Sequence, residues 1–323
     1  LSVKDGLSQS EVTGIAQDRE GFMWFSTTFG LNKYDGYTIS IYNKDRQGIY
    51  EVPYYAYYDV VSDKKGNLYV AGDNLMKYNW KTNRFVVVPN LPKIREMHID
   101  NQGSVWFVSL NYSDACFIDS AGKNFRQFTH DPNNNKSIQG KIVTSMFIDG
   151  KERLWVGFDD IPGVSCLYLE NYYKQEKKAE FLYYPTQGKV TVIYTSAGRT
   201  MFVDHLGNLY RYDETQKTPV LVTDAFAGYV VTSAIEDVKG NVWFATANQG
   251  LLLWNPVLRM RFNYNTGNSN LPSNFIRRLY LDRSGVLWMS TANGIAYTDT
   301  YAKLFNTYRY IPGYSKSLPE KSV

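Results

Sequence analysis

The chain has 323 residues, of which 44% are hydrophobic and 16% aromatic, so it can form a large core and is not a disordered segment. Its 35 basic and 31 acidic residues give a net charge of +4, and the basic residues are scattered, which excludes the basic stripe of a nucleic-acid-binding protein. No stretch approaches the roughly 20 apolar residues that span a bilayer, and no signal peptide opens the chain, so we expect no membrane contact by this segment.

A ten-residue pattern recurs seven times along the chain and is the main guide to its fold. Successive copies are spaced 37 to 49 residues apart, measured at their seventh residue. This period suits a propeller blade of roughly 40–45 residues and is too long for leucine-rich or tetratricopeptide repeats. The copies are DREGFMWFST (18–27), DKKGNLYVAG (63–72), DNQGSVWFVS (100–109), DGKERLWVGF (149–158), TSAGRTMFVD (195–204), DVKGNVWFAT (237–246) and DRSGVLWMST (282–291).

Each copy predicts a β-hairpin. The Asp that opens it is expected to cap backbone amides, and the Gly three residues later is expected to take a positive φ. Two copies depart from this pattern, because Thr195 replaces the Asp and Glu152 stands where Gly is expected. We expect slightly different turn geometry in both.

Four strands are predicted in each unit. The first precedes the hairpin, as in VTGIAQD (12–18), and the second follows it with apolar residues on both faces, as with Trp24 and Phe25. Such a strand is buried between two layers. The third strands are predicted at 30–35, 74–79, 115–120, 165–169, 208–213, 250–255 and 294–299, and the fourth at 38–42, 84–88, 125–128, 180–184, 219–222, 261–264 and 305–310.

The predicted fold is all-β, a single seven-bladed β-propeller of four-stranded antiparallel blades. If each unit runs from inner to outer strand, the ring is complete without exchange of a strand, and the first and last blades meet only through side chains; the sequence leaves open whether closure uses a strand exchanged between the termini. The final SLPEKSV (317–323) copies the lead-ins at 6–12, 137–143 and 270–276, so residues 311–323 are interpreted as the lead-in to a further repeat. The blades are expected at roughly 7–44, 54–88, 91–128, 141–184, 189–222, 230–264 and 275–310.

Catalytic and metal-binding signatures are not found in the sequence. The three histidines lack metal-ligand spacing, and no nucleophile elbow, P-loop or dinucleotide fingerprint occurs. We therefore expect no catalytic residue, no metal and no cofactor. Cys116 and Cys166 occupy similar positions in neighbouring units, and we expect buried free thiols, because such strands usually stand beyond disulfide reach.

Ligand binding is expected on one rim of the propeller. The connections between blades and the turns between second and third strands share that rim and vary in sequence, whereas the repeated hairpins lie on the opposite rim. Sugars are bound by flat aromatic faces together with amide, acid and guanidinium groups. The candidates of these kinds are Tyr54, Tyr55, Arg95, Asn111, Tyr112, Asp159, His205, Tyr229, Asn248 and Asn293.

Three recurring elements carry a family resemblance: the D-x-x-G-x-x-W-[FV] hairpin, the G-[LI]-x-x-[YW]-[DN] strand and the S-L-x-x-x-x-[VI] lead-in. By these the chain resembles the two-component regulator propeller repeats in the periplasmic sensor region of Bacteroidetes hybrid two-component histidine kinases. The resemblance implies the first propeller of a receptor anchored in the inner membrane. That receptor would sense oligosaccharides and control polysaccharide-utilisation genes. It also implies a second propeller and downstream domains on the same polypeptide, kinase activity outside this chain, and a homodimeric receptor.

Two other functions stay open at this stage. A structural or protein-interaction propeller would support dimerisation or signal transmission, with the ligand held on a second propeller, and large apolar rim patches would favour it. A propeller lyase or hydrolase would need at least two perturbed acid or base groups converging in a central pocket. Asp159 and His205 are the obvious candidates for that chemistry.

Overall fold

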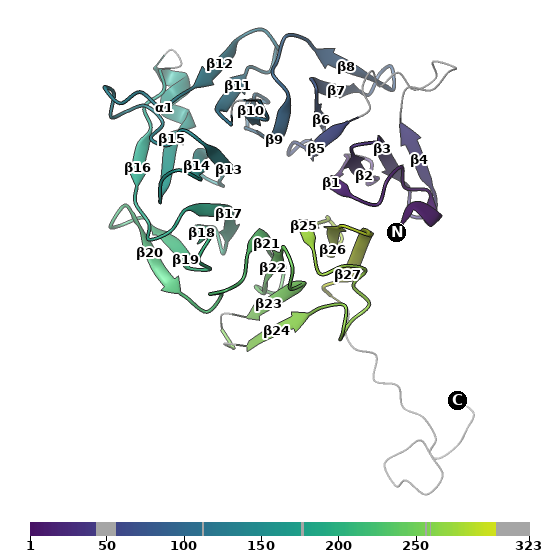
Figure 1. Ribbon diagram of the computed structural model, residues 1–323. Coiled ribbons are helices and arrows are strands. Elements are labelled where there is room, and N and C mark those ends of the chain that lie inside the picture. Colours follow the sequence, from purple (N-terminus) through teal and green to yellow (C-terminus); the bar gives the residue numbers. More distant parts are fainter. Residues whose placement is uncertain (43–55, 112, 176–177, 256, 259, 302–323) are drawn as a thin grey trace, which may run out of the picture.

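The computed structural model describes residues 1–42, 56–111, 113–175, 178–255, 257–258 and 260–301. Seven antiparallel sheets stand around a central axis, and the predicted seven-bladed propeller is confirmed (Figure 1). Blades 1 to 6 have four strands each, in the order in which they occur along the chain, and blade 7 has three described strands. The predicted fourth strand at 305–310 and the lead-in at 311–323 lie outside the described residues.

The first strand of each blade lies at the axis and the last at the perimeter (Figure 1). Besides strands, the described residues form one short helix, α1 (Leu169–Lys174), and one 3-10 turn (Val3–Asp5). The inner strands are β1 (Val12–Gln17), β5 (Tyr57–Ser62), β9 (Ile94–Ile99), β13 (Val143–Ile148), β17 (Val190–Ser196), β21 (Val231–Glu236) and β25 (Ile276–Leu281). The second strands are β2 (Met23–Thr27), β6 (Leu68–Gly72), β10 (Val105–Ser109), β14 (Arg153–Phe158), β18 (Arg199–Asp204), β22 (Val242–Thr246) and β26 (Val286–Thr291).

The two outer positions of each blade follow the same order. The third strands are β3 (Gly30–Tyr34), β7 (Leu75–Asn79), β11 (Ala115–Ile118), β15 (Val164–Tyr168), β19 (Leu209–Asp213), β23 (Leu251–Asn255) and β27 (Gly294–Asp299). The fourth strands are β4 (Ile39–Tyr42), β8 (Arg84–Val88), β12 (Phe125–Phe128), β16 (Leu182–Tyr184), β20 (Thr218–Thr223) and β24 (Met260–Tyr264).

The hydrophobic core is divided among the junctions between blades. Each of its seven clusters joins two neighbouring blades, including blades 7 and 1. In β2, Trp24 packs toward blade 2, whereas Met23 and Phe25 pack toward blade 7. Because successive side chains of a strand point to opposite faces, one strand contributes to two clusters, as the sequence pattern predicts.

The repeated Asp organises its hairpin as expected, and in five blades it also binds the tryptophan of its own repeat. Asp18 Oδ1 accepts the amides of Glu20 and Phe22 at 2.9 and 3.0 Å, and its Oδ2 accepts Trp24 Nε1 at 2.7 Å. The same indole-to-carboxylate bond recurs in four further blades, at 2.8 to 2.9 Å. The bond satisfies the indole N–H of a buried tryptophan, which would otherwise be costly. The four pairs are Trp106–Asp100, Trp155–Asp149, Trp243–Asp237 and Trp288–Asp282.

The two aberrant turns behave differently from each other. Glu152 takes φ 55° and its amide bonds Asp149 O at 3.1 Å, as the amide of Gly103 bonds Asp100 O at 3.0 Å. The expected change of geometry at Glu152 is therefore wrong. The turn after Thr195 does differ, because Ser196 pairs with Arg199 and leaves only Ala197 and Gly198, both with positive φ, as the loop.

Every inner strand carries a bulge near its start, which the sequence did not reveal. In each blade the pairing with the second strand skips one residue there. Three threonines among these residues donate to a main-chain carbonyl at the start of the next inner strand: Thr13 to Tyr57, Thr144 to Val190, and Thr232 to Ile276, at 2.5 to 3.2 Å. The bulges therefore tie neighbouring blades together around the axis. The skipped residues are Thr13, Tyr58, Arg95, Thr144, Thr191, Thr232 and Arg277.

Main-chain atoms also close the ring between blade 7 and the N-terminal segment. The N-terminal amine of Leu1 donates to Ile295 O at 2.7 Å, and the Ile295 amide donates to Leu1 O at 2.8 Å. The segment that precedes blade 1 thus pairs with blade 7 through main-chain atoms, which the sequence analysis did not predict. A side-chain contact adds to this junction, since Phe25 and Trp288 lie 5.8 Å apart between ring centroids.

Both cysteines are buried free thiols, as predicted. Burial raises the pKa of Cys116 to about 12 and raises that of Cys166 as well. Neither thiol is therefore a reactive thiolate at neutral pH.

Gly14 should be irreplaceable in the inner strand of blade 1. A Cβ there would lie 2.7 Å from both Asp59 Oδ1 and Val60 N of blade 2. We expect Gly14→Ala to lower the free energy of unfolding by about 1–3 kcal/mol, because overpacking forces the backbone to shift. Gly150→Ala is the matched control, with nothing within 4 Å of its Cβ and an expected change within about 0.5 kcal/mol. Urea unfolding of both variants checks this, and equal losses would contradict it.

Candidate functional site in the central channel

The inner strands enclose a central cavity of about 920 Å³. All seven bulge residues line it, and so do residues of the hairpin rim such as Lys64 and Glu152, so the cavity runs along the axis from one rim toward the other. A volume of this size is typical of small-ligand sites. The bulges matter for the site because they set the direction of the side chains that follow them.

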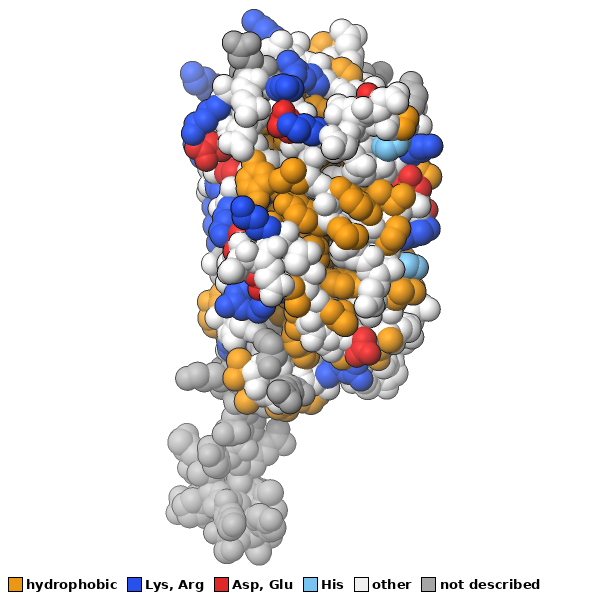
Figure 2. All heavy atoms as spheres, turned by 90° about the vertical axis from the view of Figure 1, so that its left-hand side faces the viewer, with side chains coloured by type: hydrophobic (Ala, Val, Ile, Leu, Met, Phe, Trp, Pro, Cys, Tyr) orange, Lys and Arg blue, Asp and Glu red, His pale blue; other side chains and the backbone are white. Residues whose placement is uncertain are grey.

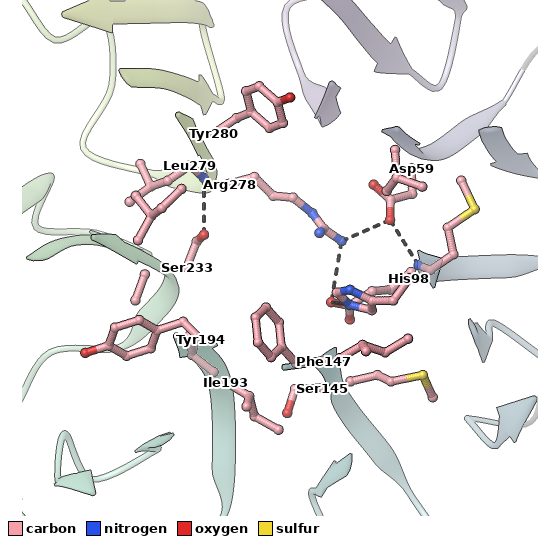
Figure 3. Close-up of a pocket in the computed structure, with 18 of the residues that line it drawn as sticks. Asp59, His98, Ser145, Phe147, Ile193, Tyr194, Ser233, Arg278, Leu279 and Tyr280 are labelled. Atoms are coloured by element: carbon pink, nitrogen blue, oxygen red, sulfur yellow. Dashed lines mark hydrogen bonds and ion pairs between the residues drawn. The ribbon is translucent and has the colours of Figure 1, made fainter. Parts of the chain in front are cut away.

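One wall of the channel carries an ionic cluster from three blades (Figure 3). Arg278 of blade 7 extends to Asp59 of blade 2 and Glu96 of blade 3, with Nη2 lying 3.5 Å from Asp59 Oδ2 and 3.8 Å from Glu96 Oε1. His98 Nε2 lies 3.6 Å from Glu96 Oε1. These side chains therefore form one connected group, although Glu96 lies 37 positions and Arg278 lies 219 positions after Asp59 in the sequence.

Asp59 is the most buried member of the cluster, with 1% of its surface exposed. Its Oδ2 accepts the Met97 amide at 3.1 Å, which links blades 2 and 3. Burial raises the pKa of Asp59 to about 6, since the attraction of Arg278 offsets only part of the desolvation. Burial also acts against ionisation of Glu96, but His98 and Arg278 outweigh it and lower the pKa of that carboxyl. The two acids thus have opposite shifts in one cavity.

Arg95 is the one predicted site residue that the described structure brings into this channel. Its Nη2 donates to the carbonyls of Val143 and Thr144 at 2.9 and 3.0 Å. The guanidinium therefore joins blades 3 and 4, the role that threonine hydroxyls have at three other junctions.

Two other predicted residues meet on the rim between blades 4 and 5, outside the channel. Lys189 Nζ lies 3.4 Å from Asp159 Oδ1, and the Lys189 amide donates to His205 Nδ1 at 3.0 Å. His205 also lies in a turn that repeats the hairpin chemistry on the opposite rim, where Asp204 Oδ1 accepts the Leu206 and Asn208 amides at 2.9 Å. A turn-forming role accounts for this segment.

The remaining predicted residues are distributed around the rim and do not converge. Asn111, Asn248 and Asn293 are exposed, and Tyr229 is half-buried against the core between blades 5 and 6. Asn293 Nδ2 donates to Pro272 O at 3.0 Å. Tyr54, Tyr55 and Tyr112 lie outside the described residues.

Sequence reasoning missed Asp59, Glu96 and Arg278, and it noted His98 only as a residue of a first strand. A signal existed, because these charged residues interrupt inner strands that are otherwise apolar or carry small hydroxyl groups. Which of them face one another depends on the ring closure, which places blade 7 beside blade 1 and within reach of blades 2 and 3.

Comparison with known proteins finds a family model that matches two segments of the chain. The family model for the two component regulator propeller matches residues 6–29 and 270–293, which are the lead-in and hairpin of blades 1 and 7. Two of the seven repeats therefore match the two component regulator propeller model. A 41-residue stretch is also 54% identical to Histidine kinase P4 of Formosa agariphila, covering 13% of this chain and 3% of that protein.

Solved structures share the whole propeller. The extracellular domain assigned to a hybrid two component system of B. thetaiotaomicron has a TM-score of 0.72 at 21% identity, covering 92% of this chain and 41% of that one. A second extracellular domain from the same organism has a TM-score of 0.74 at 18% identity, covering 93% and 39%. The present chain thus spans about two fifths of the length of these extracellular domains.

The same fold also occurs in enzymes. Virginiamycin B lyase of Staphylococcus aureus, solved as an inactive variant with quinupristin, has a TM-score of 0.68 at 12% identity and covers 92% of this chain and 97% of that one. Likeness at such low identity shows the fold alone. In the described parts of this chain, no helix is long and apolar enough to cross a membrane, and no group of three or more candidate side chains could hold a metal ion.

The raised pKa of Asp59 should appear as a pH dependence of stability. A folded-state pKa of about 6 against an ordinary 3.8 means that the unfolded chain releases this proton first as the pH rises. Asp59 therefore contributes stability at pH 4 that is lost by pH 7, about 2–3 kcal/mol. The Asp59→Asn variant has no carboxyl to titrate there. We therefore expect its free energy of unfolding, relative to that of the parent, to rise by this amount between pH 4 and pH 7.

Urea unfolding at pH 4, 5, 6 and 7 measures the difference directly. Ser145→Ala is the control, because Ser145 holds the equivalent position in blade 4 and removes no titratable group from the channel. The difference in free energy of unfolding between Ser145→Ala and the parent should not change with pH. If the difference between Asp59→Asn and the parent is also independent of pH, the Asp59 carboxyl titrates with its ordinary pKa and the prediction is wrong.

Proposed function

We propose that this chain is the ligand-sensing propeller of a hybrid two-component sensor histidine kinase of the Bacteroidetes. The receptor would be anchored in the inner membrane with this module in the periplasm, and it would detect oligosaccharides and control polysaccharide-utilisation genes. The match of blades 1 and 7 to the two-component regulator propeller supports this most directly. The extracellular domains that share the fold, and the central cavity of ligand size, add to the support.

The proposal assigns no catalysis to this chain, and kinase activity would reside in other domains of the polypeptide. A lyase or hydrolase would need acid and base groups free to transfer protons. Asp59 and Glu96 do converge in the channel, but both lie beside the same Arg278 Nη2, and Asp59 is fully buried. We propose that these groups bind and position, and that a second propeller and a homodimeric receptor complete the signalling unit.

A glycan panel tests the sensing function. In isothermal titration calorimetry of the full extracellular region, one class of oligosaccharide should bind saturably, and the other classes should give no heat of binding. Heat-denatured protein is the control for dilution heats. The absence of binding by every member of a broad panel, with the region folded, would contradict oligosaccharide sensing.

The second candidate function is protein interaction, and the outer surface favours it. Apolar side chains of the perimeter strands are exposed to 40–45% on the side formed by blades 3, 4 and 5. Figure 2 shows hydrophobic side chains gathered across the middle of this side. Exposed apolar patches of this kind mark interaction surfaces. The residues are Phe125 in β12, Leu182 in β16, and Leu221 and Val222 in β20.

If this face joins two receptor copies, charge placed on it should separate them. We expect Leu182→Glu with Leu221→Glu to reduce the dimeric fraction of the full extracellular region at least tenfold, measured by sedimentation equilibrium. Asn248→Glu, at an exposed rim position away from this face, should leave the fraction unchanged. If the double variant associates as strongly as the parent, this face is not part of the dimer interface.

A further inference from the structure

The channel has two chemically unlike walls (Figure 3). The charged wall consists of Asp59, Glu96, His98 and Arg278, from blades 2, 3 and 7. Facing it are apolar residues of blades 4 and 5, among them Phe147 and Ile193. The Phe147 ring also stands edge-on to His98, with centroids 5.8 Å apart and planes at 73°. A ligand in this channel would therefore meet fixed charges on one side and an apolar surface on the other.

The charged wall has unused hydrogen-bonding capacity. An arginine has five N–H donors, yet the Arg278 guanidinium makes no hydrogen bond within the described part of the chain, because both carboxylates lie beyond 3.4 Å. His98 Nε2 is buried and likewise lacks a hydrogen-bond partner among those residues. Most buried polar groups in proteins are paired. The ion pairs of Arg278, Glu96 and His98 thus leave hydrogen-bonding capacity of these groups unused in the same cavity.

The charge of the channel favours a neutral ligand. Besides His98, its lining holds four acids and four bases. An anion approaching Arg278 would also meet Glu96 and Asp59, and a cation approaching Glu96 would meet Arg278. A group that can both donate and accept avoids either repulsion. The acids are Asp59, Glu96, Asp149 and Glu152, and the bases are Lys64, Arg95, Arg277 and Arg278.

We infer that the channel binds a neutral sugar ring, with two neighbouring hydroxyl groups alongside the Arg278 and Glu96 pair and one apolar ring face toward Phe147. One hydroxyl donates to the Glu96 carboxylate and the next accepts from the Arg278 guanidinium. A pair of adjacent hydroxyls suits this arrangement because the two protein groups are 3.8 Å apart and of opposite polarity. This inference rests on the proposed function and places its ligand in the channel rather than on the rim.

Blade 1 is built to permit this arrangement. Arg278 belongs to blade 7 and has to extend past blade 1 to reach blades 2 and 3. Gly14 occupies the position of blade 1 that corresponds to Asp59, Glu96 and Arg278 in their own strands, directly after the bulge. Because Gly14 has no side chain, the space in front of Asp59 stays open to the guanidinium.

The test is calorimetry on the full extracellular region with tetrasaccharides of three kinds. The neutral probes are built from glucose, xylose, galactose or mannose, the acidic probe from galacturonic acid and the cationic probe from glucosamine. We expect a neutral probe to bind. Glu96→Gln keeps the size of the side chain but removes its negative charge, and Arg278→Lys keeps the positive charge but removes the planar guanidinium. Each variant should weaken binding of the neutral probe at least tenfold. Gln216→Ala, in the exposed turn between β19 and β20 and away from the channel lining, is the matched control and should leave binding within twofold.

The outcomes separate the two proposals. Binding of a neutral probe that both channel variants leave within twofold would overturn the channel site and leave the sensing function standing. Selective binding of the acidic or cationic probe would overturn the neutral class. If no probe binds, both proposals are contradicted. Should Arg278→Lys not fold, Phe147→Leu replaces it, with an expected severalfold loss, and unchanged affinity in that variant would equally overturn the channel site.

Discussion

The structure depends on burying two apolar faces of every blade. A sheet apolar on both faces is stable only between two others, and each of the seven core clusters spans a junction between blades. The last junction, between blades 7 and 1, is built like the rest and contains Trp288 and Phe25. Because no blade can be left with an open face, the array closes, and the closed ring creates the central channel.

Closure also determines how the inner strands meet. In four described blades the side chain of the bulge residue is turned toward the next inner strand, where its hydroxyl or guanidinium donates to a main-chain carbonyl. The following residue then faces the axis or the adjacent blade, as Asp59 and Arg278 do. The same local irregularity therefore fastens the ring and supplies the polar groups of the channel.

The sequence allowed much of the fold to be predicted and little of the site. Strands, blade number and hairpin chemistry follow from short-range patterns, such as the Asp18 and Trp24 pair within one repeat. Arg95 was predicted as a site residue because of its residue type and place, and it does line the channel, although its guanidinium bonds main-chain carbonyls. The rim residues were chosen because loops vary in sequence. Variation in sequence does not indicate which side chains come together in one site.

Local chemistry also explains where turn predictions failed. Glu152 adopts the left-handed conformation expected of glycine, so the hydrogen-bond pattern set by Asp149 outweighs the backbone preference of that residue. The hairpin chemistry missing from the first turn of blade 5 recurs at Asp204 on the opposite rim.

The amino-acid sequence by itself determined the repeat, the β-strands, the two buried faces and hence the propeller, because each arises from contacts within one unit or between successive units. Only the tertiary structure decided that Asp59, Glu96, His98 and Arg278 form one cluster. Their contact requires blade 7 to return to blade 1, and it depends on bulges that aim each side chain. Interactions across a closed ring join residues far apart in sequence, and no periodic pattern records which of them will face one another.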